Sequence, residues 1–509
     1  MRNHILTLLA FAACTFSSAA QNASVTVVPE TGFTGRGNRC ETLLDMEIAS
    51  DEACSLRSIS LSLEGSADLN DMEMIYVFFN SDNGDRIELG KARPSHKDIV
   101  FRLRKPFPEI TGNAAVQVCA DISGDAVEGN RIKASIRSVK TDKGSYVPAA
   151  VENPGREILL ARVRLYAPGD HGSRNWRIPA ICCLGDGSLL AVNDKRKFNE
   201  GDLPADIDIV ASRSTDGGLT WSEPVDIAVG QGYKKGFGDP ALAVTEDGEI
   251  ICAFVGGNGL WASTPEDPQR SYISRSTDGG KSWSQPEDIT SIIYGPEADN
   301  PQCRKYRSSF FGSGNGITLR HGEHAGRIMF VAAMYPAQYL NNHAVYSDDG
   351  GKTWHVSDVA FEGGDEAKVV ELSDGRILMS IRRSGERGYS ISCDGGETWS
   401  GQGLWPEINT NACNGDMIRY SSTDDGKGYN LLLHSIPNDR ERRNVSIFRS
   451  YDEGQSWVSP KTICPGNSVY SSLTVLNDGT IGIYVEENPG EEGCSLWFMN
   501  FSLDWLTRP

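Results

Sequence analysis

The stretch Ser214-Thr-Asp-Gly-Gly-Leu-Thr-Trp221 decides the fold, because its pattern, Ser-x-Asp-x-Gly-x-x-Trp, occurs five times in the chain. We call this pattern the box. The other copies are Ser276–Trp283, Ser347–Trp354, Ser392–Trp399 and Ser450–Trp457, and successive box aspartates lie 62, 71, 45 and 58 residues apart. Recurrence at such intervals indicates supersecondary units that are stacked or arranged radially, not a single wound sheet.

Each box predicts a hairpin turn between two strands. An alternating strand-like run precedes it, as in Ile209–Ser214 and Ser446–Ser450. The Asp carboxylate can accept hydrogen bonds from nearby backbone N–H groups, and the Gly can supply a positive φ. The Trp offers a large apolar face to a neighbouring unit. Since the ligand series of a calcium loop is missing, we expect the boxes to be structural.

The repeat length predicts an all-β fold with a six-bladed β-propeller over residues 156–509. Residues 162–509 hold about six periods, which fits six four-stranded blades. A strand near Leu159–Tyr166 is expected to pair with one near Ser495–Phe501 and close the ring. Residues 23–155 lack boxes and contain short alternating runs separated by Gly, Asn, Asp and Pro, which favours a β-sandwich. Such a domain is either carbohydrate-binding or a packing module.

The N-terminus predicts export. Residues 1–20 resemble a signal peptide, because Arg2 and His4 precede an apolar run and small residues, Ser18-Ala-Ala20, offer a cleavage site. We therefore expect a periplasmic or secreted protein, with lipid anchoring through Cys14 as a less favoured alternative. No other segment has the apolar length of a membrane span.

Composition limits which partners and cofactors we expect the protein to bind. The net charge of −19 argues against nucleic acid as a partner, although a local basic site for a small anion remains compatible with it. Eleven cysteines follow Cys14, an odd number without a CxxC spacing, and the eight histidines show no metal-like spacing. We expect no metal and no cofactor.

Segments between the boxes carry a family resemblance. They are Trp176-Arg-Ile-Pro179, Asp194-Lys-Arg196, Gly238-Asp-Pro240, Gly314-Asn-Gly-Ile317, Glu366-Ala-Lys-Val-Val-Glu371, Arg442-Arg-Asn444, Tyr470-Ser471 and Asp478–Glu486. The order of these segments along the five boxes carries the resemblance. Over residues 162–505, the chain resembles the bacterial exo-α-sialidases, or neuraminidases, of the six-bladed type. This implies sialylated glycans, the glycosides of N-acetylneuraminic acid, as substrates.

The chemistry of that substrate explains the basic residues. Sialic acid carries a carboxylate on its anomeric carbon, and arginine binds carboxylate through a planar, permanently charged fork. The resemblance assigns this task to Arg177, Arg382 and Arg442. It makes Glu486 the carboxylate that orients the first arginine, and it places Arg196 and Asp239 along the pocket for the glycerol and N-acetyl side of the sugar.

The resemblance also implies the reacting groups. A carboxylate nucleophile would approach the negatively charged substrate, whereas a tyrosine is neutral until it attacks, and sialidases depart from the two-carboxylate rule for this reason. Tyr470 is the implied nucleophile and Glu366 its base, because a phenol with a pKa of about 10 needs one. Asp202 is the implied acid/base residue, and two inversions at one carbon give net retention.

Neighbouring residues compete for these roles. Arg383, Arg440 and Arg443 are alternatives to the chosen arginines, and alternation along a strand puts Arg383 on the face opposite to Arg382. Glu371 competes with Glu366. Asp206 and Asp208 compete with Asp202.

Two other functions fit the boxes. A non-catalytic sialoglycan-binding propeller would keep the arginines but would not need Asp202 or the Tyr470–Glu366 pair. A trans-sialidase, or an enzyme that forms an anhydro-sugar, would use the same residues and exclude water from its acceptor site.

Overall fold

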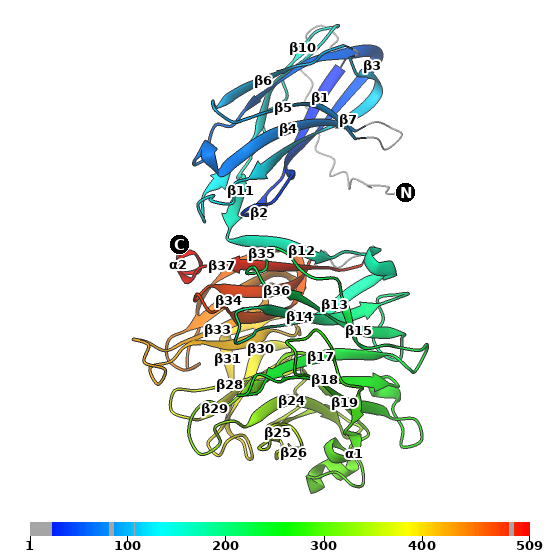
Figure 1. Cartoon of the computed structure of the whole chain (residues 1–509), viewed down its shortest axis with the longest axis vertical. Coiled ribbons are helices and arrows are strands. Elements are labelled where there is room, and N and C mark those ends of the chain that lie inside the picture. The colour runs from blue at the N-terminus through cyan, green and yellow to red at the C-terminus, as the bar shows by residue number, and fades with distance from the viewer. Residues whose placement is uncertain (1–22, 81–85, 106, 488–492, 509) are drawn as a thin grey trace. The chain divides into compact units, whose positions relative to one another are not determined.

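The protein was analysed as a computed structural model, which describes residues 23–80, 86–105, 107–487 and 493–508. The predicted signal peptide and Cys14 lie outside these residues. The chain divides into two compact units (Figure 1). Of the described residues, the first unit holds 23–31, Arg39–Ala126 and Asn130–Glu157, and the second holds Gly32–Asn38, Val127–Gly129 and those from Ile158 onward. Both are built almost entirely from strands, as the all-β prediction requires.

The first unit is a β-sandwich built around one long strand, β3 (Glu41–Ser62). Its first half pairs with β1 (Ala23–Pro29) and β7 (Glu109–Ile122), and that sheet continues through β4 (Met72–Asn80) to β5 (Arg86–Ala92). Its second half pairs with β6 (Asp98–Arg102) and β9 (Ser135–Thr141), which pairs with β10 (Ser145–Tyr146). β8 (Arg131–Ile132) pairs with β11 (Arg156–Leu159). Side chains from both halves are fully buried, among them Leu44, Ile59, Val77 and Val118.

The second unit is the predicted six-bladed propeller, and its first three blades follow in chain order. Blade 1 contains β13 (Asn175–Cys183), β14 (Leu189–Arg196), β15 (Ile207–Ser214) and β16 (Val225–Ala228). Blade 2 contains β17 (Phe237–Val244), β18 (Ile250–Gly257), β19 (Gln269–Ser276) and β20 (Glu287–Asp288), with β22 (Gly314–Asn315) parallel to β17. Blade 3 contains β21 (Ser308–Phe311), β23 (Ile317–Thr318), β24 (Ile328–Tyr335), β25 (Asn341–Ser347), β26 (His355–Val356) and β27 (Phe361–Glu362).

The last three blades complete the ring. Blade 4 contains β28 (Ala367–Glu371), β29 (Ile377–Ile381), β30 (Gly385–Ser392) and β31 (Ser400–Thr410). Blade 5 contains β32 (Asp416–Ser421), β33 (Leu431–Pro437), β34 (Arg443–Ser450) and the first half of β35 (Val458–Val475). Blade 6 contains the rest of β35, β36 (Ile481–Glu487), β37 (Ser495–Phe501) and β12 (Ala161–Tyr166). β12 and β37 pair antiparallel, so the predicted closure of the ring is confirmed (Figure 1).

The apolar cores lie between blades. One core joins blades 1 and 2, four more join each later blade to the next, and another joins blade 6 back to blade 1. In β18 the alternate residues Ile250, Cys252 and Phe254 face blade 1, whereas Ile251, Ala253 and Val255 face blade 3. Because both faces of each sheet are buried, such strands are continuous apolar runs in the sequence.

The boxes are turns that lock each blade against its predecessor. In every copy the Ser Oγ donates to the Asp Oδ1 and accepts from the Gly N–H, at 2.8–2.9 Å. Gly218 has φ +91°, and a Cβ there would lie 2.0 Å from a ring carbon of Phe498 in blade 6. Trp221 packs on the same ring with centroids 5.3 Å apart. Backbone freedom and close approach therefore require the box glycine.

Candidate active site

The two ends of each blade differ, and register fixes which residues share an end. In blade 1 the box residue Ser214 pairs with Leu189, which pairs with Cys183 at the last position of β13. At the other end of β13, Arg177 pairs with Asp194. We call the end with the boxes the box end and the end with Arg177 the site end.

Arg177 is held at the site end by Glu486. Two guanidinium nitrogens, Nε and Nη2, donate to the two carboxylate oxygens at 3.2 and 3.1 Å. The same carboxylate, which is fully buried, accepts the backbone N–H groups of Ile178 at 2.7 Å and Tyr470 at 3.3 Å. Glu486 thus fixes both the arginine fork and the backbone that carries Tyr470, consistent with the orienting role expected for it.

Tyr470, Glu366 and Arg382 form one hydrogen-bonded group. The Tyr470 hydroxyl donates to Glu366 Oε2 at 3.0 Å. Arg382 Nη1 lies 2.7 Å from the Tyr470 hydroxyl oxygen and also donates to Glu366 Oε2. Glu366 precedes the first residue of β28, and Arg382 follows the last residue of β29, which pairs with β28. Both charged groups beside the phenol therefore come from one blade, at the end of the β28–β29 pair that is opposite to its turn.

Arg442 completes a ring of three guanidinium groups around Tyr470. It is exposed, and its Nη2 donates to the carbonyl oxygen of Ala412 at 3.3 Å. Its guanidinium carbon lies 5.8 Å from the centroid of the Tyr470 ring, and that of Arg177 lies 5.2 Å from it. Three arginines from three blades thus surround a single tyrosine.

Arg196 organises the acidic side of the cluster. It is 2 % exposed and bonds the Asp194 carboxylate at 3.0 Å and the Asp202 carboxylate at 2.8 Å. The other oxygen of Asp194 accepts the backbone N–H of Asp239 at 3.1 Å, where the backbone has φ +59°. The side chain of Asp202 is 79 % exposed, so it is accessible to a substrate.

The charges shift several pKa values. Burial and the negative charge of Glu366 raise the pKa of Tyr470 well above its ordinary value, so its phenol is neutral. Burial and the charges of Asp194 and Asp202 raise the pKa of Asp239 well above its ordinary value. Burial also raises the pKa of Asp194, to about 6.

Asp202 shows the opposite balance. Partial burial works to raise its pKa, but the positive charges of Arg196, Arg177 and Arg442 outweigh that effect, and the pKa lies below its ordinary value. A ligand carboxylate that neutralised Arg177 and Arg442 would therefore raise the pKa of Asp202.

The competing residues lie elsewhere or are paired differently. Arg383 donates to the carbonyl oxygen of Glu386, and Arg443 pairs with Asp439 at 2.9 Å. Glu371 stands at the far end of β28, where it accepts the N–H groups of Arg320 and His321. Asp206 and Asp208 both pair with Lys197; Asp206 precedes β15 and Asp208 is the second residue of that strand. The structure thus brings together the nine residues that the sequence nominated: Arg177, Arg196, Asp202, Asp239, Glu366, Arg382, Arg442, Tyr470 and Glu486.

Sequence reasoning gave no role to three residues that support this cluster. Asp194 links Arg196 to Asp239, and its spacing of two from Arg196 on one strand face was the available signal. Asp365 lies 3.3 Å from Arg382 Nε. Arg387 is 2 % exposed and donates to Ser380 Oγ and the Cys413 carbonyl oxygen. No sequence pattern marked Asp365 or Arg387.

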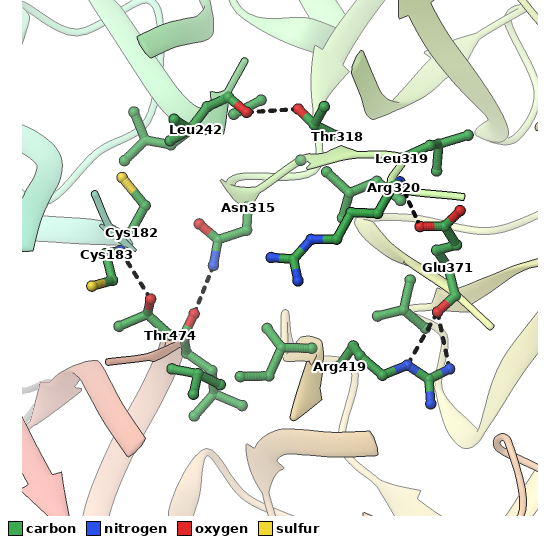
Figure 2. Close-up of a pocket in the computed structure, with 18 of the residues that line it drawn as sticks. Cys182, Cys183, Leu242, Asn315, Thr318, Leu319, Arg320, Glu371, Arg419 and Thr474 are labelled. Atoms are coloured by element: carbon green, nitrogen blue, oxygen red, sulfur yellow. Dashed lines mark hydrogen bonds between the residues drawn. The ribbon is translucent and has the colours of Figure 1, made fainter. Parts of the chain in front are cut away.

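A cavity of about 540 Å³ lies at the box end of the same strands. Figure 2 shows Arg320 extending toward its centre, among Asn315, Thr474, Glu371 and Arg419. The nine clustered residues do not line it. It contains no group that resembles the tyrosine–glutamate pair, so we place the chemistry at the site end.

The described residues contain neither a candidate metal site nor a candidate membrane-spanning helix. No group of three or more His, Cys, Asp or Glu side chains in this part of the chain is placed to hold a metal ion. No helix in the described ranges is long and apolar enough to cross a membrane.

Comparison with known proteins shows what this chain is similar to. The model of the BNR repeat-like domain matches residues 190–483. A sialidase of Micromonospora viridifaciens is 36% identical over 371 residues, 69% of this chain and 55% of that relative. A sialidase of Bacteroides fragilis (strain YCH46) is 31% identical over 396 residues, 70% of this chain and 68% of that relative. The solved Hadza microbial sialidase Hz136 shares the fold, with a TM-score of 0.75 and 23% identity over 94% of this chain and 100% of that chain.

The fold and the match together define a β-propeller of the BNR-repeat class. The chain belongs to the bacterial sialidase family within that class. It spans just over half the length of the Micromonospora relative.

Proposed function

We propose that the protein is an exo-α-sialidase that hydrolyses terminal α-linked sialic acid from glycoproteins, glycolipids and oligosaccharides. One observation carries the proposal: a neutral tyrosine bonds a glutamate at 3.0 Å while three guanidinium groups surround it. That arrangement suits a substrate whose reacting carbon carries a carboxylate, because the arginines bind the charge beside the nucleophile.

The first step forms a bond between Tyr470 Oη and the anomeric carbon. Glu366 Oε2 takes the phenolic proton as the attack proceeds, which is required because the pKa of Tyr470 is raised. Asp202 gives its proton to the departing glycosidic oxygen, and the rest of the glycan leaves as an alcohol. Arg177, Arg382 and Arg442 hold the substrate carboxylate throughout.

The second step releases the sugar. Asp202, now a carboxylate, takes a proton from water, whose oxygen attacks the anomeric carbon. The tyrosyl oxygen leaves and recovers its proton from Glu366. Two inversions at one carbon return the original α configuration, so the mechanism is retaining.

Binding of substrate raises the pKa of Asp202, the proposed acid. In the free protein the arginines lower the pKa of Asp202. The substrate carboxylate neutralises Arg177 and Arg442, so the pKa of Asp202 rises when the glycoside is bound and the acid holds its proton more firmly. The same event that selects the substrate thus favours the proton transfer.

A hydrolysis assay tests the proposal. The protein should release the fluorophore from a fluorogenic α-N-acetylneuraminide, and proton NMR should detect the α anomer as the first product. A β anomer as the first product would contradict the retaining mechanism. Binding of sialic acid without hydrolysis would favour the lectin alternative, and a transferred or anhydro product would favour the trans-sialidase alternative.

A further inference from the structure

A second, smaller cavity lies in blade 3, and its volume is about 300 Å³. At about 30 Å³ per water it holds roughly ten waters, which is about the size of one hexose. Its walls come from the helical turn η4 (Pro301–Lys305), the β24–β25 connection and the segment before β28. The proposed mechanism uses none of these residues.

Register places this cavity beside the proposed catalytic carboxyl. Asn341 and Glu362 line it and pair across β25 and β27. The next residue, Asn342, donates to the carbonyl oxygen of Asp365 at 2.5 Å, directly before Glu366. Glu366 is four positions after Glu362, and an extended chain spans at most about 14 Å over that length. Asn341 stands at the end of β25 opposite to the box residue Ser347, so the cavity lies at the site end of blade 3, and its lining residue Glu362 is within about 14 Å of Glu366.

The lining has the chemistry of a site for a neutral sugar. Tyr306 and Tyr339 supply aromatic rings, and three side-chain amides, those of Gln302, Gln338 and Asn341, supply both donors and acceptors. Aromatic faces match the C–H face of a pyranose, while amides match its hydroxyl groups. Lys305 and Glu362 bring opposite charges, so the lining has no net charge.

Part of this lining is held in place before any ligand binds. The Asn341 amide donates to the Tyr306 hydroxyl at 3.2 Å, and that hydroxyl bonds His343 at 3.0 Å. Asn341 and Tyr306 are buried, whereas Tyr339 is 45 % exposed at the rim. Between Pro336 and Gln338, both in the lining, Ala337 has φ +91°, a strained value for a residue with a Cβ.

We propose that this cavity binds a neutral pyranose unit of the glycan chain that carries the terminal acidic sugar. The inference rests on the proposed function, because it names the part of the same substrate that lies beyond the cleaved bond. The lining contains no arginine, which distinguishes it from a second cradle for a sugar carboxylate.

Paired substrates test the inference. For wild type, Tyr339→Ala and Gln338→Ala, kcat/KM is measured on a fluorogenic N-acetylneuraminide, which has no further sugar, and on a sialylated tetrasaccharide. We expect the ratio of tetrasaccharide to fluorogenic kcat/KM to fall about fivefold in each variant. The matched control is Tyr451→Ala, an equally exposed tyrosine within a box, which should keep the wild-type ratio. An unchanged ratio in both cavity variants would overturn the inference.

A binding measurement separates this inference from the proposed function. The asialo form of the tetrasaccharide is titrated into the full-length protein and followed by saturation-transfer NMR. Wild type should give a signal that Tyr339→Ala loses, whether or not the protein hydrolyses sialosides. Absence of hydrolysis would then count against the proposed function alone, and absence of the signal in wild type would count against the cavity as a sugar site.

Discussion

The two ends of the propeller blades use the same strands for different purposes. At the box end, five turns repeat one hydrogen-bond pattern, in which Ser Oγ joins the Asp carboxylate to the Gly N–H. At the site end, Glu366 and Tyr470 each occur once, and the three arginines stand at different strand positions in their blades: within β13, after β29 and before β34. Repetition in this molecule marks what every blade needs in order to pack, whereas the reacting groups stand at positions that do not repeat.

The arrangement of charge differs in the same way. At the box end Arg419 is bound by both oxygens of Glu453 at 2.6 and 2.7 Å, a closed pair. At the site end three arginines converge on one tyrosine. Arg177 and Arg382 also pair with carboxylates, Glu486 and Glu366, but unlike Arg419 they share one further neighbour, the Tyr470 side chain.

The largest expected difference in kcat comes from removing one tyrosine hydroxyl at the site end and one at the box end. Tyr470→Phe should lower kcat on the fluorogenic sialoside on the order of 10³-fold or more, because the proposed nucleophile is lost. Its affinity for free sialic acid should persist. Tyr420→Phe is the control: it removes a hydroxyl that bonds the Gly479 carbonyl oxygen near the box end, and its kcat should stay near wild type. Near-normal turnover by Tyr470→Phe would refute the assignment.

Removing one arginine at each end should have the next largest effect. Arg382→Ala should lower kcat/KM by about 10²-fold, since a charged fork to the substrate carboxylate and a partner of Glu366 disappear together. Titration with free sialic acid should show a matching loss of affinity. Arg419→Ala breaks a comparable ion pair at the box end and should change stability, not kcat/KM. Equal kinetic losses in the two variants would contradict the division between the ends.

The pH dependence should reveal the coupling between the arginines and Asp202. A general acid works only while protonated, so activity falls as pH rises through its pKa. The pKa of Asp202 is lowered in the free protein, and we expect it to rise when a substrate carboxylate neutralises Arg177 and Arg442. The basic limb of kcat should therefore lie at higher pH than the basic limb of kcat/KM. Coincident limbs would mean that the substrate carboxylate does not bind those arginines.

A box substitution should affect stability alone. Ser347 Oγ donates to Asp349 and accepts from Gly351 N–H, and the residue is fully buried. Ser347→Ala leaves that N–H unpaired and should lower the free energy of unfolding by about 1–2 kcal/mol. Denaturant titration measures the loss, and kcat/KM of the folded protein should stay within about twofold of wild type. A large kinetic defect would show that the boxes also support the chemistry.

The difference between the box end and the site end also explains how much of the fold and of the site could be predicted from the sequence. The boxes predicted the blade count and the pairing of β12 with β37, because a repeat reports its own period. The predicted site residues came from the family resemblance that the ordered segments carry, and the structure brings them together. Asp194 and Arg387 were not given roles, because their importance lies in contacts across the fold: Asp194 to the N–H of Asp239 in the next blade, and Arg387 to the carbonyl oxygen of Cys413. The cavity in blade 3 combines three separate segments, and no local pattern marks it.

The smallest expected effect comes from the cavity at the box end. Arg320 extends toward its centre and is 74 % exposed, with Asp425 at 3.9 Å (Figure 2). Exposed ion pairs of this kind contribute at most about 1 kcal/mol. This one lies at the box end, whereas Arg177 precedes the box end of β13 by six residues, about 20 Å of strand. Arg320→Ala should therefore leave kcat/KM and the unfolding midpoint nearly unchanged. A tenfold fall in kcat/KM would show that the box end communicates with Tyr470, and the contrast between the two ends would need to be abandoned.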